Sequence, residues 1–345
     1  MSTKSLGVED ILQMVSNLSD KHVLKGMPEQ YVCDFAKAAV NVYDSRKVGK
    51  MLRKRFCVPN ESNFDGSAYL QSATELSVAN YVKASQVIDF ETEKKVNPTN
   101  NKDVDIYYQT GTTNVYLEVK CPTEEVQQTL PTVTLLAGGR MPDYQRRLAN
   151  VRRALSSKSS LNIVDGKRAD LRLKDALVSS HQKFKPVPNF DDLNILFLAC
   201  GDFYKMSEWH GYLFGQGGLF TGDPFHPAET FRNVDCIMLS NLKYRHETAF
   251  DFPAWSLDDV LLIPISNPHG RKSVFDATIT EGLSIFKHYR KEFLSNRIVR
   301  PGAEEIQEAI APQTKVTWFF DRHLNAEEKK RFFPVSPTGW TSPTQ

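Results

Sequence analysis

Long apolar segments are missing from this chain of 345 residues, which has no run of 18 or more apolar residues. A membrane-spanning helix needs about 20 such residues, so no span is expected. The first ten residues also lack the apolar segment of a secretory signal. Cysteine is scarce, and the five cysteines form no close pairs in the sequence. We therefore expect reduced thiols, no disulfide or zinc site, and a cytoplasmic location.

A strong net charge is also missing, because the formal charge is only +2 at pH 7. Any nucleic-acid binding must therefore depend on local basic patches. The sequence has no GxxxxGK[ST] phosphate loop, no GxSxG elbow and no internal repeat. These absences exclude a P-loop nucleotidase, an α/β-hydrolase of the usual type and a solenoid. With 41% hydrophobic and 24% charged residues, the composition is that of an ordinary globular protein.

The most informative segment covers residues 103–121, where two stretches alternate polar and apolar residues around a Gly-Thr pair. This period of two predicts a β-hairpin. A type II′ turn at Gly111-Thr112, with glycine first, sets Asp105 opposite Glu118. In the second strand Glu118 and Lys120 share one face, and the apolar residues share the other.

Two opposed carboxylates are a poor choice for stability, because like charges about 5 Å apart repel each other. They are a good choice for a divalent metal, since hard cations such as Mg²⁺ take carboxylate oxygens. The alternative is a structural ladder on a solvated face, in which Glu118 and Lys120 pair with Asp103 and Asp105.

Glu75 on an upstream helix, Asp105, and Glu118-Val119-Lys120 together resemble the PD-(D/E)xK nuclease superfamily. The resemblance covers about residues 67–200: a helix with an acid, three strands, an acid in the second strand, Glu-x-Lys in the third, then a helix and an apolar strand. It departs from the superfamily's name at Val104, which stands where the proline would be.

This resemblance implies an α/β protein with a restriction-endonuclease-like core, a mixed central sheet flanked by helices. It also implies metal-dependent hydrolysis of phosphodiester bonds, with Mg²⁺ as the cofactor and Mn²⁺ as a substitute. Asp105, Glu118 and the Val119 carbonyl would be metal ligands, and Lys120 would act on the attacking water and the transition state. Glu75 would reach the metal's water shell or a second metal; otherwise it is a surface acid.

On the helix expected over residues 169–184, the same resemblance suggests that a Gln or Lys points into the site. Gln182 is the candidate.

Two basic segments are candidates for nucleic-acid contact. The first includes Lys50, Arg53, Lys54 and Arg55, and the second, in an insertion near 122–168, includes Arg140, Arg146, Arg147, Arg152 and Arg153. The alternative for each is an ordinary solvated helix surface. An aromatic-rich segment at 203–233 has two interpretations, base stacking or a packed excursion, and we favour packing.

The expected organisation is an N-terminal helical region (1–60), a nuclease-like core (61–270), a C-terminal helical region (271–333) and a disordered tail (334–345). DNA is the expected partner, a restriction or defence role is suggested by analogy alone, and a homo-oligomer or a partner protein stays open. The rival hypotheses are a non-catalytic nucleic-acid-binding protein and a protein-interaction module on the same fold.

Overall fold

A computed structural model of the chain describes residues 6–44, 47–59, 64–122, 132–134, 149–150, 153, 162–164, 169–185, 189–215, 218–249, 253–272 and 276–287. In this part of the chain a mixed six-stranded sheet has the order β1-β2-β3-β6-β7-β8. Its strands are β1 (Asp89–Lys95), β2 (Asp103–Thr110), β3 (Thr113–Lys120), β6 (Asp192–Ala199), β7 (Cys236–Ser240) and β8 (Leu262–Ser266).

The type of strand pairing changes twice along this order, from antiparallel to parallel and back to antiparallel. Neighbours β1, β2 and β3 are antiparallel, β3, β6 and β7 are parallel, and β8 is antiparallel to β7. A separate short ladder pairs β4 (Thr132–Thr134) with β5 (Asn162–Val164). The coarse expectation of an α/β fold with a mixed central sheet is confirmed.

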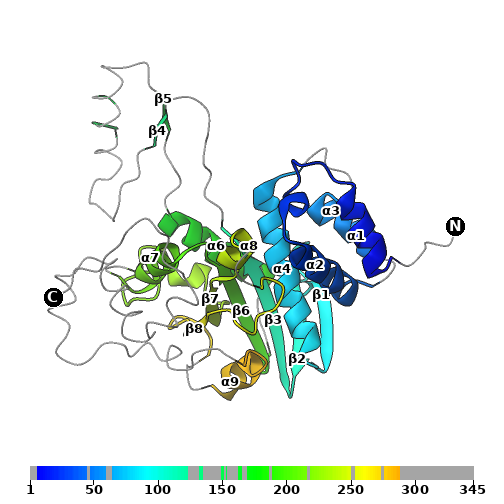
Figure 1. Ribbon diagram of the computed structural model, residues 1–345. Helices are drawn as coiled ribbons and strands as arrows, with labels where there is room; N and C mark the ends of the chain where they lie inside the picture. Colours follow the sequence, from blue (N-terminus) through cyan, green and yellow to red (C-terminus); the bar gives the residue numbers. More distant parts are fainter. Residues whose placement is uncertain are drawn as a thin grey trace, which may run out of the picture.

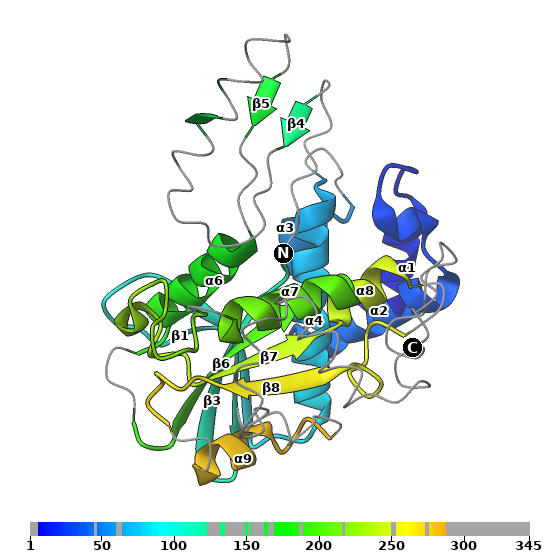
Figure 2. The same cartoon turned by 90° about the vertical axis from the view of Figure 1, so that its left-hand side faces the viewer.

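Helices cover both faces of the sheet (Figures 1 and 2). The helices are α1 (Val8–Ser16), η1 (Val23–Gly26), α2 (Glu29–Val42), α3 (Val48–Phe56), α4 (Gly66–Ala84), α6 (Ala169–Lys183), α7 (Phe203–Phe214), η2 (Ala228–Thr230), α8 (Leu242–Glu247) and α9 (Ala277–Leu283). One face of the sheet is covered by α4, α8, α9 and the N-terminal helices, and the other by the helices α6 and α7. None of these helices is long and apolar enough to cross a membrane.

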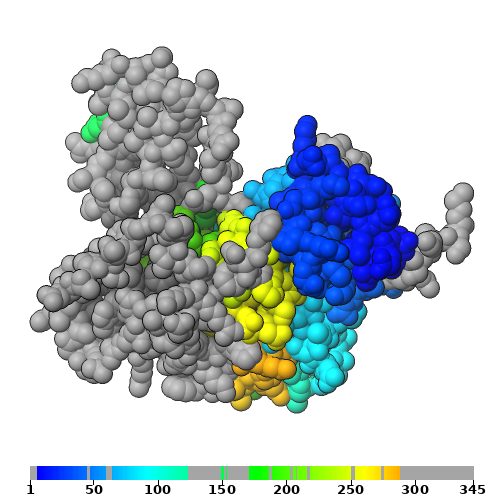
Figure 3. Space-filling model, in the orientation of Figure 1, coloured from blue at the N-terminus to red at the C-terminus, as the bar shows by residue number. Residues whose placement is uncertain are grey.

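The N-terminal helices share one apolar core with the sheet. Ile11 of α1, Phe35 of α2 and Phe56 of α3 are buried in the same cluster as Leu117 of β3. In the space-filling view these helices, drawn in blue, lie directly against the cyan segment that follows them (Figure 3). The described part of the expected helical region, residues 6–44 and 47–59, is therefore packed onto the core, which fixes the end of α3 beside the sheet.

Local signals explain where the key elements begin. Asp65 caps α4, because its side chain accepts a hydrogen bond from the Ser67 backbone N–H at 3.0 Å. The hairpin turns at Gly111, whose φ of +52° suits glycine. The ladder pairs Thr110 with Thr113 and continues to Ile106 with Leu117, as the turn predicts.

One detail of the hairpin differs from strict alternation. A strict period of two places Val104 on the same face as Ile106, but Val104 is buried in the α6-side cluster with Tyr107, whereas Ile106 lies in the α4-side cluster. Strand β2 therefore changes face at Asp105, the residue between them.

In strands β6 and β8 and in the aromatic segment, the burial and position of the residues agree with what their residue types favour. Every residue of β6 is buried, as expected for a central strand covered on both sides. Pro264 lies in β8, which is an edge strand, where a missing N–H costs no ladder bond. In the aromatic segment, Trp209, Phe220 and Phe231 are buried in the core cluster, which confirms packing for these three.

Candidate active site at the end of β3

The site lies where β2 and β3 stop pairing with each other. The last backbone pair toward this end is Ile106 with Leu117, so the next backbone groups of β3 need other partners. The Val119 N–H donates to Asp105 Oδ2 at 2.8 Å. Side chains thus replace the strand partner, and the carboxylate of Asp105 is held between the two strands.

Gln71 of α4 completes this replacement. Its Nε2 donates to the Val119 carbonyl at 2.9 Å, and its Oε1 accepts from the Cys121 N–H at 2.7 Å. One side-chain amide therefore imitates a neighbouring strand. Gln71 lies in the second turn of α4, so these two hydrogen bonds also fix the position of α4 over the end of β3.

The buried carboxylate of Glu118 is the centre of the site. The residue is 0% exposed. Its Oε1 lies 2.6 Å from Lys120 Nζ and 2.6 Å from Lys183 Nζ, and its Oε2 accepts from Lys183 Nζ at 2.8 Å. Lys183 Nζ also lies 3.7 Å from Asp105 Oδ1. Asp105 and Glu118 therefore converge on one cationic group.

Burial and charge together shift the acidity of the pair Glu118 and Lys120. Burial, and secondly the Asp105 charge, raise the pKa of Glu118 to about 7, although Lys120 and Lys183 act in the opposite direction. Burial lowers the pKa of Lys120, but the Glu118 carboxylate outweighs burial and the pKa is raised overall. Lys120 is therefore an ammonium at neutral pH.

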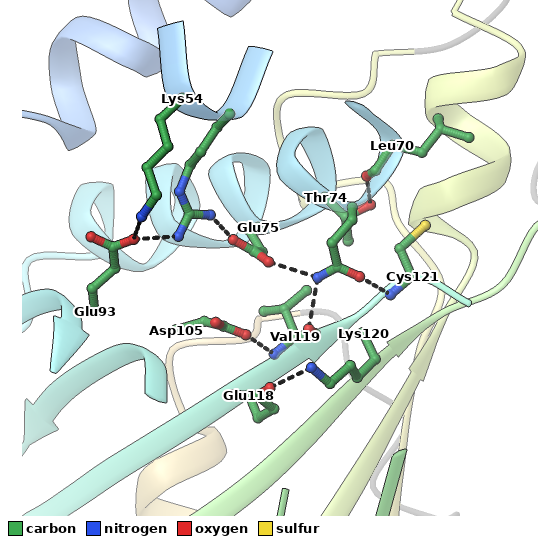
Figure 4. Close-up of polar contacts among 12 residues, drawn as sticks. Lys54, Leu70, Thr74, Glu75, Glu93, Asp105, Glu118, Val119, Lys120 and Cys121 are labelled. Atoms are coloured by element: carbon green, nitrogen blue, oxygen red, sulfur yellow. Dashed lines mark hydrogen bonds and ion pairs between the residues drawn. The ribbon is translucent and has the colours of Figure 1, made fainter. Parts of the chain in front are cut away.

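A second group of charges, which includes Glu75 and Glu93, lies on the α4 side (Figure 4). Gln71 links it to the first group, because its amide donates to both Glu75 and the Val119 carbonyl. Gln71 Nε2 donates to Glu75 Oε1 at 2.7 Å, and Glu75 Oε2 forms an ion pair with Arg55. Arg55 also donates to Glu93 Oε1 at 2.7 Å. Lys54 lies 3.4 Å from the same oxygen of Glu93.

Glu93 occupies an unusual backbone position. Its φ is +55° within β1, a value that non-glycine residues seldom adopt in a strand. Burial raises the pKa of its carboxyl. The hydrogen bond and the charge of Arg55 lower this pKa by more than burial raises it, so the pKa is lowered overall. The pairing with Arg55 helps to hold this strained residue in place.

The structure brings together Glu75, Asp105, Glu118, Val119 and Lys120, five of the residues expected from the sequence, but it corrects Gln182. The Gln182 side chain is exposed, and its Oε1 accepts from Lys102 Nζ at 2.8 Å, away from the carboxylates. Lys183, one residue later, reaches the carboxylates instead. Adjacent residues on a helix point about 100° apart, so only one of the two can face the site.

Arg55 is a second correction. The sequence places it in a basic surface, but its side chain is 17% exposed and is turned inward to Glu75 and Glu93. Lys50, Arg53 and Lys54 are exposed on α3, as expected. Arg153 is exposed, and the other insertion arginines lie outside the described residues: Arg140, Arg146, Arg147 and Arg152.

The sequence reasoning missed Gln71, Lys183 and Glu93. A signal existed for Lys183, because it follows the small residues Ala176 and Ser180 at helical spacing. The structure shows that both of these are buried. A signal also existed for Gln71, four residues before Glu75 on the same helix. The positive φ of Glu93 leaves no mark in the residue type.

The oxygen atoms of the site suit a hard divalent cation. Within the described residues no group of three or more His, Cys, Asp and Glu side chains is placed to hold a metal. Two carboxylates are enough for Mg²⁺, which keeps several waters and binds through one or two of them. Glu118 Oε1 is buried and accepts no hydrogen bond of good geometry, although two ammonium groups lie beside it. A cation that binds this oxygen would therefore take the place of an ammonium group and would break no well-formed hydrogen bond.

Comparisons with protein-family models, curated proteins and solved structures give no match for this chain. The function of this chain is therefore inferred from the geometry of this site.

Proposed function

We propose that this protein is a metal-dependent nuclease that hydrolyses phosphodiester bonds, with DNA as the expected substrate, on a restriction-endonuclease-like core. The convergence of Asp105 and Glu118 beside Lys120 carries the proposal. Asp105 comes from β2, and Glu118 and Lys120 come from β3. They lie together at the end where β2 and β3 stop pairing.

The order of elements also supports the proposed core. In the chain, α4 with Glu75 is followed by β1, β2 with Asp105, β3 with Glu118 and Lys120, then α6 and the buried strand β6. The antiparallel arrangement of β1, β2 and β3 and the parallel pairing of β3 with β6 place the acids and Lys120 at one end of the sheet.

Stability alone gives a weak reason for this cluster. Burying the Glu118 carboxylate and partly burying Asp105, Lys120 and Lys183 has a desolvation cost. Well-packed apolar residues often stabilise such positions more. Strongly shifted pKa values concentrate at functional sites, and the Glu118 pKa of about 7 is such a shift.

The residues have distinct tasks in this proposal. Asp105, Glu118 and the Val119 carbonyl would hold Mg²⁺, which supplies a more acidic bound water and accepts negative charge from the phosphate. Lys120, held as an ammonium by Glu118, neutralises charge that develops on the phosphate in the transition state. Gln71 and Arg55 orient Glu75, whose Oε1 is held toward the Val119 carbonyl by the amide of Gln71.

The exposed cations of α3 give the substrate a surface beside the site. Lys50, Arg53 and Lys54 are solvent-exposed, and Arg55 of the same helix connects it to Glu75. Phosphates of a bound strand would contact these side chains as the strand approaches the carboxylates.

A non-catalytic nucleic-acid-binding protein is the second candidate, and one observation favours it. Both Glu118 and Glu75 already have cationic partners, Lys120 and Lys183 for the first and Arg55 for the second. A structural ion-pair network would look the same.

A cleavage assay separates the two candidates. Purified protein is incubated with supercoiled DNA, linear DNA and RNA in Mg²⁺, Mn²⁺ or EDTA. The nuclease proposal expects cleavage that EDTA abolishes and that Glu118→Gln abolishes in the same preparation. Metal-independent binding without cleavage would favour the second candidate.

A further inference from the structure

Lys183 occupies the position at which the two carboxylates converge. Its Nζ contacts both oxygens of Glu118, at 2.6 and 2.8 Å, and lies 3.7 Å from Asp105 Oδ1. Lys120 differs from it, because it forms an ion pair with Glu118 Oε1 only. One ammonium therefore bridges the two acids, and the other lies to one side.

We propose that Lys183 is a built-in counter-ion of the cation site, and that a divalent ion binds to Asp105 and Glu118 by displacing its ammonium. The inference rests on the metal site of the proposed function and adds a competitor for that site. Lys183 then sets the affinity of the site for the metal.

Geometry makes the two cations mutually exclusive. A magnesium ion lies about 2.1 Å from each carboxylate oxygen that it binds. An ammonium nitrogen at 2.6 and 2.8 Å from the two oxygens of Glu118 occupies the approach that such an ion needs. Two cations on one buried carboxylate, with a third at Lys120, would also repel one another strongly.

Charge explains why an occupant is needed. Without the metal, and with both acids ionised, Lys120 and Lys183 balance the charges of Asp105 and Glu118. Removing Lys183 alone would leave two carboxylates and one ammonium at a largely buried site. When a divalent ion replaces the ammonium, the carboxylates stay neutralised, and the side chain of Lys183 is free to turn on its four-carbon stem.

The side chain of Lys183 reaches solvent, whereas Glu118 does not. Lys183 is the last residue of α6, and its side chain is 17% exposed, in contrast to the fully buried Glu118. Rotation of the Lys183 stem toward solvent would take the ammonium away from the carboxylates.

Manganese binding, measured by calorimetry on the full chain, tests the exchange. Lys183→Met removes the competing charge, and we expect it to bind Mn²⁺ at least about ten-fold more tightly than the wild type. Lys183→Arg keeps the charge and should bind no more tightly than the wild type. Lys185→Met is the matched control, because Lys185 lies two residues away and pairs with Asp192 instead. Equal affinity of wild type and Lys183→Met would overturn the exchange.

A second measurement uses the wild-type protein and does not depend on the folding of a variant. Lysines are acylated at fixed pH with and without Mn²⁺, and the modified peptides are quantified by mass spectrometry. We expect Mn²⁺ to speed the modification of Lys183 by several-fold and to leave Lys185 unchanged. A Lys183 rate that does not change while Mn²⁺ binds overturns the proposal.

The two proposals fail in different ways. If the wild type binds Mn²⁺ and Asp105→Asn abolishes this binding, the metal site stands even when Lys183→Met has no effect. If neither the wild type nor Lys183→Met binds Mn²⁺, both the exchange and the metal site are wrong.

Discussion

The carboxylate of Asp105 accepts a hydrogen bond from the backbone N–H of Val119 at 2.8 Å, in the place where a strand carbonyl would otherwise accept. Asp105 Oδ2 therefore supplies the hydrogen-bond acceptor that the Val119 N–H needs. Asp105 Oδ1 is directed to Lys183, which lies beside Glu118. This arrangement couples the local structure of the hairpin to the chemistry of the site. Substitutions of Asp105 should therefore affect the stability of the hairpin and the cleavage activity separately.

Asp105→Asn and Asp105→Ala should differ in stability although both abolish cleavage. Asparagine retains an oxygen for the Val119 N–H and removes the repulsion with Glu118, so the free energy of unfolding should stay equal or rise slightly. Alanine leaves a buried N–H without a partner, at a cost of about 1–3 kcal/mol. Urea unfolding in EDTA measures both. A loss of stability in Asp105→Asn as large as in Asp105→Ala would show that the negative charge itself supports the fold.

Lys120→Met should reduce the cleavage rate by about a hundred-fold or more, because the ammonium stabilises charge that forms only in the transition state. Binding of DNA should change little. The stability loss should stay below about 2 kcal/mol, since Lys183 remains to balance the buried Glu118 carboxylate.

Single-turnover kinetics and equilibrium binding measure the two effects of Lys120→Met. Lys185→Met serves as the control, and it should cleave like the wild type. Retained cleavage in Lys120→Met would assign Lys120 to the ion-pair network alone.

Stability in the absence of metal should fall as the pH rises from about 5 to 8. The pKa of Glu118 is raised from 4.5 to about 7 in the folded protein, so the folded state binds more protons than the unfolded state over this range. Stability therefore decreases with increasing pH, and the effect ends above the folded pKa. Urea unfolding at several pH values, compared with Glu118→Gln, isolates this contribution, which is of the order of 1–3 kcal/mol. The same slope in both proteins would remove Glu118 as its source.

Neighbouring cations of α3 should behave differently in DNA binding. Replacing exposed Lys50 and Arg53 with glutamine should lower the slope of log affinity against log salt by about 0.9 for each phosphate that the variant no longer neutralises. Arg55→Gln should leave that slope unchanged, because Arg55 is turned inward to Glu75 and Glu93.

Fluorescence anisotropy over a range of salt concentrations measures these slopes. If Arg55→Gln reduces the slope and the Lys50 and Arg53 changes do not, the nucleic acid approaches from a different side.

The hairpin was predictable because its information is local. A glycine at the turn and a period of two in each strand fix the register, and the pairs from Thr110–Thr113 to Ile106–Leu117 agree with it. The faces of Glu118 and Lys120 follow from the same alternation. The change of face at Val104 was not predictable, because it depends on where β2 and β3 separate.

Other parts of the site depend on tertiary contacts. The choice between Gln182 and Lys183 depends on the rotation of α6 about its axis, which packing against the sheet decides. The roles of Gln71 and Arg55 depend on how α4 and α3 dock at the open end of β3. Residue type alone makes Arg55 look like a surface cation.

The most direct test of the proposed chemistry is cleavage of supercoiled DNA by the wild type and by Glu118→Gln, each with Mg²⁺ and with EDTA. A metal-dependent nuclease with Glu118 as a ligand predicts nicked or linear product only for the wild type in Mg²⁺. Equal cleavage by the wild type and Glu118→Gln, or cleavage that persists in EDTA, would contradict it.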